Sequence, residues 1–322
     1  MKVLVTGGAG YIGSLTVYKL IELGHEVLVI DNLTTGRLGN IDERAKFIEG
    51  DIRDFELISR YMFGVDVVFH FAALAIVSQS VTHPEEYFDV NVRGSENVLL
   101  AMKNAKIGKI VFASSCAVYG DQNSGLITEK SNTIPINSYG QSKLDFDNLL
   151  RRDAFETGLC AISLRFFNVA GAVNAGKRWF GENHEPETHL IPLIMQASSN
   201  NPLIIHGTDL DTTDGTCIRD FVHVDDITDA FILCLNLPSE PGYLVINLGS
   251  GKGSSVMEVI SMASKIKQME IPFKRGPSRL EDPAYLAADN KLAAEKIGWI
   301  PSRNLEDIIS DAFNFLIASK TE

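Results

Sequence analysis

The sequence has few cysteines and no pattern that would pair them. The four cysteines are Cys116, Cys160, Cys217 and Cys234, and no two of them form a C-x-x-C motif. The spacing therefore indicates neither a zinc site nor a redox pair, and no metal is expected. Buried thiols in a reducing compartment are the simplest interpretation.

Long apolar runs and an excess of positive charge are also missing. No run reaches the about 18 apolar residues that a membrane span needs. The apolar start of the chain is interrupted by Gly7 and Gly8, as in a strand rather than a signal peptide. The formal net charge of -12 argues against binding to nucleic acid, which requires clustered basic side chains. We expect a cytoplasmic protein with neither nucleic acid nor membrane as a partner.

The rest of the composition is that of an ordinary globular protein. The chain has 322 residues, of which 45% are hydrophobic and 22% are charged, values typical of soluble domains. A chain of this length forms one large domain or two small ones and can bury a core without disulfides.

Short apolar runs alternate with helix-like stretches through the first half of the chain. Strands are expected at 3–5, 27–30, 65–69, 110–112 and 161–165. Helices are expected at 11–23, 54–62, 85–104 and about 139–157, the last preceded by the capping residues Asn137 and Ser138. Runs rich in β-branched residues indicate strands buried on both faces. Their separation by helices predicts an α/β fold with a doubly wound, parallel Rossmann sheet.

The character of the sequence changes after Gly171, where turn-forming residues become frequent. We expect a Rossmann domain at 1–168 and a smaller α/β substrate-binding lobe at 169–219 and 249–322. The segment 220–248 has the pattern of a helix followed by a strand and is expected to return to the main sheet.

A glycine-rich loop follows the first expected strand and opens the first expected helix. Gly7, Gly10 and Gly13 form the pattern G-x-x-G-x-x-G. Such glycines let the backbone approach a pyrophosphate, and the helix N-terminus favours the anion. Asp31 ends the second expected strand, where an acid can bind ribose hydroxyls and would repel a 2′-phosphate. The pattern predicts a dinucleotide site that prefers NAD to NADP.

A tyrosine and a lysine are spaced to share one face of a later helix. Tyr139 and Lys143 are four residues apart. A free tyrosine is a poor base at neutral pH, because its pKa is about 10. A nearby ammonium and a positive nicotinamide ring would lower that pKa. Tyr139 could then take a proton from a sugar hydroxyl while hydride goes to NAD. Ser115 ends the fourth expected strand, where its hydroxyl could order the proton path.

Eight stretches together resemble the bacterial UDP-glucose 4-epimerases, within the extended short-chain dehydrogenase/reductase family. They are VTGGAGYIG at 5–13, IDNLTTG at 30–36, HFAA at 70–73, FASSCAVYG at 112–120, SYGQSKL at 138–144, LRFFNVAGA at 164–172, ETHLIP at 187–192 and DGTCIRDFVHV at 214–224. The early stretches are common to the extended reductases, whereas LRFFNVAGA and DGTCIRDFVHV are specific to a much smaller group of proteins. The resemblance covers essentially the whole chain.

The resemblance implies a role for each matching residue. The pyrophosphate would be bound by Gly7, Gly10, Tyr11, Ile12 and Gly13, the adenosine ribose by Asp31, Asn32 and Gly36, the adenine by Asp51 and Ile52, and the rest of the NAD by Phe71, Ala72, Ala73, Asn91, Tyr139, Lys143 and Phe166. The catalytic residues would be Tyr139, Lys143 and Ser115. The nucleotide sugar would contact Ser115, Phe167, Asn168, His189, Leu190, His206, Arg219, Arg279, Asp282 and Leu286.

The activity implied by the resemblance is the NAD-dependent 4-epimerisation of a UDP-hexose. Hydride would leave C4 of the sugar, the 4-keto intermediate would turn, and hydride would return to its other face, with no net redox change. Similar enzymes form homodimers through two helices, which here lie at about 85–104 and 139–157.

Three positions depart from the pattern of these epimerases. Ala75 replaces a lysine that some of them use as a cofactor contact, and His206 stands where an aromatic is frequent near the uracil. Leu286 falls where a tyrosine restricts some relatives to non-acetylated sugars. A leucine leaves more room, so the N-acetylated pair of substrates is an additional expectation.

Other activities on the same fold remain open. Epimerases of other UDP-sugars, such as uronic acids or pentoses, share nearly all these motifs. Nucleotide-sugar dehydratases and decarboxylases carry acids where this chain has Cys116 and Ala117. A non-catalytic NAD-sensing regulator would usually lack the Tyr139 and Lys143 pair, and Asp31 disfavours a net oxidoreductase that uses NADP.

Overall fold

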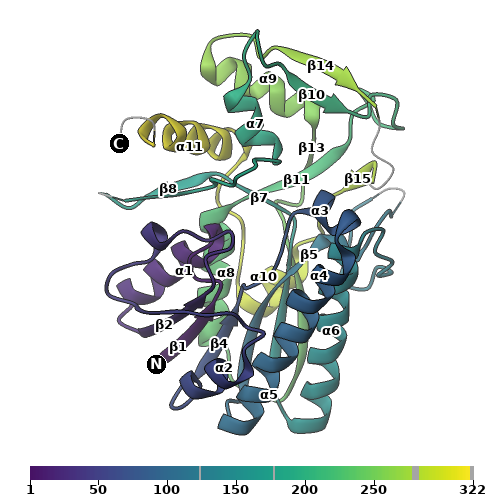
Figure 1. Cartoon of the computed structure of the whole chain (residues 1–322). Helices are drawn as coiled ribbons and strands as arrows, with labels where there is room; N and C mark the ends of the chain where they lie inside the picture. Colours follow the sequence, from purple (N-terminus) through teal and green to yellow (C-terminus); the bar gives the residue numbers. More distant parts are fainter. Residues whose placement is uncertain (123–124, 177, 278–282, 320–322) are drawn as a thin grey trace.

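The computed structural model describes residues 1–122, 125–176, 178–277 and 283–319. Within these residues the main sheet has seven parallel strands in the order β12-β6-β5-β4-β1-β2-β3 (Figure 1). These strands are β1 (Lys2–Thr6), β2 (Glu26–Asp31), β3 (Lys46–Glu49), β4 (Val67–His70), β5 (Lys109–Ser115), β6 (Cys160–Phe166) and β12 (Gly242–Leu248). The order reverses between β1 and β4, so the predicted doubly wound sheet is confirmed.

Helices cover both faces of this sheet. Because alternate strand residues point to opposite faces, Val3 and Val5 of β1 pack on one side and Leu4 packs on the other. The first side is covered by α1 (Tyr11–Glu22), α8 (Val224–Asn236) and α10 (Lys291–Ile297). The second side is covered by α2 (Phe55–Tyr61), α5 (Ser95–Ala105) and α6 (Ser138–Thr157).

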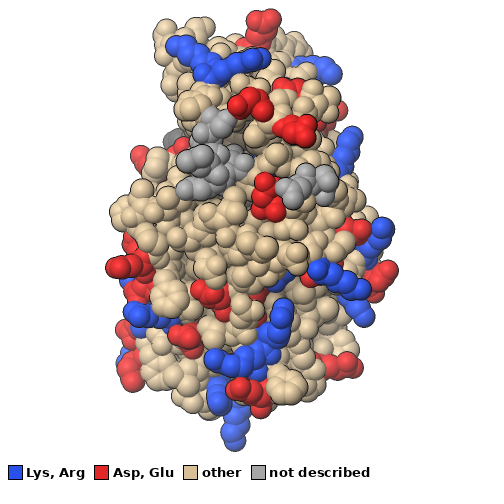
Figure 2. Space-filling model, turned by 90° about the vertical axis from the view of Figure 1, so that its right-hand side faces the viewer, with Lys and Arg blue, Asp and Glu red and all other residues tan. Residues whose placement is uncertain are grey.

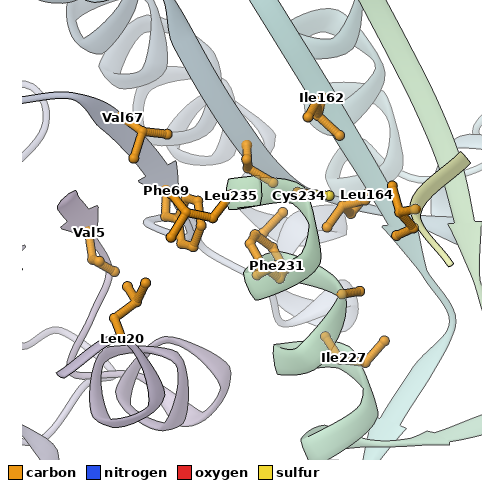
Figure 3. Packing of buried hydrophobic residues seen from close by; sticks show 14 of the residues in the cluster. Val5, Leu20, Val67, Phe69, Ile162, Leu164, Ile227, Phe231, Cys234 and Leu235 are labelled. Atoms are coloured by element: carbon orange, nitrogen blue, oxygen red, sulfur yellow. The ribbon is translucent and has the colours of Figure 1, made fainter. Parts of the chain in front are cut away.

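The packing under α8 shows how a later segment joins the main sheet. Figure 3 shows Phe231, Cys234 and Leu235 of α8 facing residues of the strands, among them Phe69 of β4. The ring centroids of Phe69 and Phe231 lie 5.6 Å apart in an edge-to-face arrangement, which adds to the burial energy. After α8 the chain forms β12, which pairs with β6 along the whole strand.

A smaller lobe lies above the carboxyl ends of the main strands (Figure 1). Its strands are β7 (Asn168–Ala170), β8 (Ala172–Asn174), β9 (Trp179–Gly181), β10 (Leu203–His206), β11 (Ile218–His223), β13 (Gly253–Ser255), β14 (Phe273–Gly276) and β15 (Tyr285–Leu286). Its helices are α7 (Leu190–Gln196), α9 (Val256–Lys267) and α11 (Leu305–Ala318). Ile194, Val259 and Ile308, one from each of these helices, are buried together in a core of its own.

The helix expected at 85–104 is confirmed, with one wider turn in its middle. The chain is helical through α4 (Pro84–Phe88), a π-helical turn at Asp89–Gly94 and α5, and a separate short helix, α3 (Val77–Thr82), precedes them. The wider turn contains Asn91, whose amide bonds the backbone of Leu74 at 2.8 and 3.0 Å. A side chain that ties a helix to a neighbouring loop gives the π turn a physical reason.

Other local expectations are met. The side chain of Asn137 accepts a 2.8 Å hydrogen bond from the Gly140 amide and caps α6 as predicted. All four cysteines are buried. None of the helices in the described part of the chain combines the length and apolarity needed to cross a bilayer.

Candidate functional site

A cavity of about 980 Å³ lies between the main sheet and the smaller lobe. Ligands of open parallel sheets bind at the carboxyl ends of the strands, where the strand order reverses. Most of the predicted site residues line this cavity: Gly7, Gly10, Tyr11, Ile12, Gly13, Asp31, Asn32, Asp51, Ile52, Phe71, Ala72, Ala73, Ser115, Tyr139, Lys143, Phe166, Phe167, Asn168, His189, Leu190, His206, Arg219 and Leu286. Ala75, one of the three departures, lines it as well.

Two predicted residues do not line the described cavity, and two others lie outside the described residues. Gly36 packs behind the glycine loop, where a Cβ would lie 2.8 Å from the Cβ of Ala9. Asn91 holds the loop at Leu74 instead of facing the cavity itself. Arg279 and Asp282 lie outside the described residues.

The glycine loop leaves no room for side chains on its inner side. Gly7 has a φ of +73°, and a Cβ there would lie 2.5 Å from the amide nitrogen of Ala72. A Cβ on Gly13 would lie 2.2 Å from the carbonyl oxygen of Gly7. The backbone of β1, the loop and α1 therefore pack as closely as the glycine pattern predicts.

Asp31 ends β2 and fixes the loop from its other side. Its carboxylate accepts hydrogen bonds from the amides of Ala9 at 2.9 Å and Leu33 at 2.8 Å. Burial raises the pKa of Asp31, and these two hydrogen bonds oppose the shift. Next to it, Asp51 accepts a 2.9 Å hydrogen bond from Asn32 and pairs with Arg53. Asp31, expected at the ribose, and Asp51, expected at the adenine, thus lie at the same end of the cavity.

The predicted catalytic residues meet at the floor of the cavity. Tyr139 and Lys143 are both buried on α6, and Ser115 ends β5 beside them. The Nζ atom of Lys143 donates a 2.9 Å hydrogen bond to the carbonyl oxygen of Ala113 and lies 5.8 Å from the ring centroid of Tyr139. A tyrosine, an amine and a hydroxyl in this arrangement can pass a proton to and from a bound hydroxyl group.

Lys143 by itself does not lower the pKa of Tyr139, and the expected acidification also involves the positive nicotinamide ring. Burial raises the pKa of Tyr139 to about 12, and only a hydrogen bond with Ser115 opposes it, while Cys116 and Tyr87 raise it further. Burial also lowers the pKa of Lys143 to about 7, with Asp147 opposing. Desolvation outweighs the attraction between the two groups, because Lys143 is bound to a backbone carbonyl and not to the phenol.

A buried ion pair lies directly behind the catalytic helix. Asp147, one helical turn after Lys143, is bonded by Arg165 Nε at 2.9 Å and by Ser114 Oγ at 3.2 Å. Arg165 also donates a 3.1 Å hydrogen bond to the hydroxyl of Tyr119. These fully buried contacts tie α6 to β5 and β6 and fix the position of the Lys143 side chain above them.

The substrate side of the cavity is formed by residues that are distant in sequence. β11 and β15 pair in parallel with Arg219 opposite Leu286, so a guanidinium and an apolar side chain lie next to each other. His206 ends β10, and its ring bonds the carbonyl oxygen of Pro277 at 3.1 Å. Phe167 comes from the end of β6 and packs with Leu286 and Cys116. A guanidinium in such a wall suits a diphosphate.

The segment 182–189 adds charged groups that the sequence analysis mostly missed. Burial raises the pKa of Glu182, but His184 and His189 outweigh it and bring this pKa to about 2. Burial lowers the pKa of His189, but Glu182 and Glu187 outweigh it and raise this pKa to about 10. The spacing E-x-H-x-x-E-x-H was the available signal, but the segment shows no helical or strand periodicity that would place its side chains together.

Comparison with known proteins shows to which protein family this chain belongs. The model of the NAD dependent epimerase/dehydratase family matches residues 3–249. The chain belongs to this family, and the expected cofactor agrees with the family description.

Within this family, the chain is similar to UDP-glucose 4-epimerases, the enzymes that its motifs resemble. The UDP-glucose 4-epimerase of Lacticaseibacillus casei is 42% identical over 321 residues, which are 98% of this chain and 96% of the relative. The crystal structure of UDP-glucose 4-epimerase from Brucella ovis in complex with NAD is 39% identical, with a TM-score of 0.92 and 98% of each chain covered. The UDP-glucose 4-epimerase from Bifidobacterium longum in complex with NAD+ and UDP is 33% identical, with a TM-score of 0.94 and 99% of each chain covered. The resemblance stated from the motifs is confirmed.

Proposed function

We propose that this protein is an NAD-dependent UDP-sugar 4-epimerase that interconverts UDP-glucose and UDP-galactose. The observation that carries the proposal is the meeting of Tyr139, Lys143 and Ser115 at the floor of a cavity lined by the glycine loop at one end and by Arg219 at the other. The proposal is supported by relatives named UDP-glucose 4-epimerase whose alignment covers nearly the whole chain.

The cofactor end would hold NAD through the backbone and through Asp31. The loop residues Gly7, Gly10 and Gly13 offer close approach and a helix N-terminus to the pyrophosphate. The Asp31 carboxylate would accept hydrogen bonds from the adenosine ribose and repel a 2′-phosphate. Bound NAD would supply the hydride acceptor and donor for C4, and its positively charged ring would oppose the burial that raises the pKa of Tyr139.

Tyr139 would take the proton of the C4 hydroxyl as the sugar is oxidised and return it as the sugar is reduced. Ser115 would share the proton through its hydrogen bond with Tyr139. Lys143, held by the Ala113 carbonyl, would lie beside the phenolate, and Asp147 opposes the burial that lowers the pKa of this lysine. The 4-keto sugar would turn inside the cavity between the two hydride transfers.

The nucleotide sugar would lie along the substrate side. Arg219 would pair with the diphosphate, while Phe167, Asn168 and Leu190 would position the sugar. Leu286 would leave space beside C2 for an N-acetyl group, so UDP-N-acetylglucosamine and UDP-N-acetylgalactosamine are proposed as a second pair of substrates.

The protein is also proposed to act as a cytoplasmic homodimer. Exposed apolar side chains that do not line the cavity lie on α4, α5, α6 and the segment before α6: Phe88, Leu100, Ile134 and Phe155. Figure 2 looks onto the side where α3, α4 and α6 lie in Figure 1, and few charged side chains cover the middle of this face. An apolar surface of this kind supports a contact between two copies.

Light scattering should give a dimer mass, and Leu100→Glu should shift this mass towards that of the monomer.

One assay tests the activity directly. The purified protein should convert UDP-galactose to UDP-glucose without added NAD and without accumulated NADH, as followed by NMR. A requirement for stoichiometric added cofactor would contradict the epimerase mechanism. A product that has lost water or carbon dioxide would instead assign the chain to the dehydratases or decarboxylases.

A further inference from the structure

Four metal-ligating side chains converge between β9 and α7, on the substrate side of the cavity. Glu182, His184, Glu187 and His189 each offer one ligand atom, and these atoms all lie within 4.8 Å of one another. The four residues come from one short segment, so their approach depends on the path of a single loop and not on the packing of distant elements.

Two of the three ion-pair distances inside this cluster match the spacing of ligand atoms in a tetrahedral metal site, and the third is shorter. The Nδ1 atom of His189 lies 2.8 Å from Oε1 of Glu182 and 3.3 Å from Oε1 of Glu187. The Nδ1 atom of His184 lies 3.3 Å from Oε1 of Glu182. Zinc holds nitrogen and oxygen ligands at about 2.0–2.2 Å, which puts neighbouring ligand atoms about 3.3–3.6 Å apart. A central ion therefore requires only small side-chain shifts.

A second observation points to a ligand at the same place. The Nδ1 atom of His184 is buried and makes no hydrogen bond in the described structure, although it faces the Glu182 carboxylate. A buried nitrogen without a hydrogen bond costs free energy. A metal ion would bind the lone pair of this nitrogen directly.

The charge balance of the cluster also suits a divalent cation. The side chains of Glu182 and Glu187 are both only 7% exposed, so two carboxylates are held together with little access to water. His189 lies between the two carboxylates and offsets part of their charge, whereas a divalent cation would neutralise both. Two imidazoles and two carboxylates form a mixed nitrogen and oxygen set that suits zinc better than magnesium or calcium.

The site is accessible from two sides. His184 lines both the main cavity and a neighbouring cavity of about 430 Å³. An ion could therefore enter from either cavity.

We propose that Glu182, His184, Glu187 and His189 form a binding site for one zinc ion per chain. The ion joins both ends of the loop between β9 and α7 and fixes the wall from which His189 faces the substrate. The proposal departs from the expectation of no metal, which rested on cysteine spacing alone. It does not depend on the proposed epimerase activity, because zinc binding is measured without substrate.

The test is to remove metals from the full-length protein with EDTA and then to titrate it with zinc in a calorimeter. We expect one ion per chain. Loss of a partner outside the ligand set typically weakens metal binding by about 10–100-fold, so the ligand change His184→Ala should weaken it by more than about 100-fold. Glu182→Gln should act in the same direction. Glu185→Gln, an exposed carboxylate in the same loop, is the matched control and should bind zinc as the wild type does.

Two further measurements keep the result decisive. Thermal melting without zinc shows whether each variant is folded, and His184→Ala is the safer variant because its side chain is 26% exposed. The absorption spectrum of the Co²⁺-loaded protein should show the intense visible bands of a tetrahedral site in the wild type and in Glu185→Gln. Zinc binding that is absent, or that is equal in the wild type and in His184→Ala, would mean that the cluster is an ion-pair network only.

Discussion

The two ends of the cavity are built in different ways. At the cofactor end, backbone atoms of the glycine loop and one carboxylate, Asp31, form the surface, and Gly7 and Gly13 have no room for a side chain. At the substrate end, side chains such as Arg219 and Leu286 project from short strands of the smaller lobe. Substitutions at the cofactor end should therefore abolish NAD binding, whereas substitutions at the substrate end should change which sugar is accepted. The four predictions below test this contrast, and Tyr139 lies between the two ends.

Tyr139→Phe should cause the largest loss. General acid–base catalysis contributes about 10²–10⁴-fold to a rate, so kcat for UDP-galactose should fall by about that factor while bound NAD is retained. The phenyl ring keeps the packing on α6, so the melting temperature should change little. Tyr61→Phe on α2, outside the cavity, is the control. Wild-type turnover in Tyr139→Phe would remove this residue from the mechanism.

Gly13→Ala tests the backbone-built end. The added methyl would lie 2.2 Å from the Gly7 carbonyl oxygen, and forced overpacking of this kind costs about 1–3 kcal/mol. The free energy of unfolding in urea should fall by that amount, and the purified protein should lose most of its NAD, as measured by absorbance after denaturation. Gly108→Ala, where a Cβ meets nothing within 4 Å, should keep both properties. If Gly13→Ala retained full NAD occupancy, the loop would be less rigid than described.

The buried lysine gives a pH dependence of stability. The pKa of Lys143 is lowered to about 7 in the folded state, whereas an unfolded lysine titrates near 10.4. Between these values the unfolded state binds more protons, so stability rises with pH by at most about 1.4 kcal/mol per unit. Urea unfolding at pH 7 and pH 9 should show a rise in the wild type that is smaller in Lys143→Met. Equal slopes in the two proteins would mean that Lys143 is solvated and charged throughout.

The same contrast explains how much could be predicted from the sequence. The strands of the main sheet and the glycine loop follow from local patterns, because each depends on residues that are adjacent in the chain. Arg219 and Leu286 are distant in the sequence and become neighbours only when β11 pairs with β15, so no local pattern could predict their contact. Only the resemblance to a known family placed both residues at the substrate. The burial of Tyr139, which raises its pKa, could not be predicted from the spacing of Tyr139 and Lys143. The cluster at 182–189 was overlooked because its loop has no periodicity.

Leu286→Tyr should give the smallest effect and tests the substrate end. Leu286 is buried against Phe167 and Cys116 and lines the cavity, so a tyrosine there would project into the space proposed for the N-acetyl group. Differences of this kind in a pocket are worth about 1–3 kcal/mol, or about 10–200-fold in kcat/KM. The variant should lose that factor with UDP-N-acetylgalactosamine and keep most of its activity with UDP-galactose, as read by NMR with both substrates. Leu286→Met, which conserves volume, should leave the ratio of the two activities unchanged. An equal loss with both sugars would show that the residue supports the fold of the wall and does not select the substrate, and the contrast between the two ends would then fail at this position.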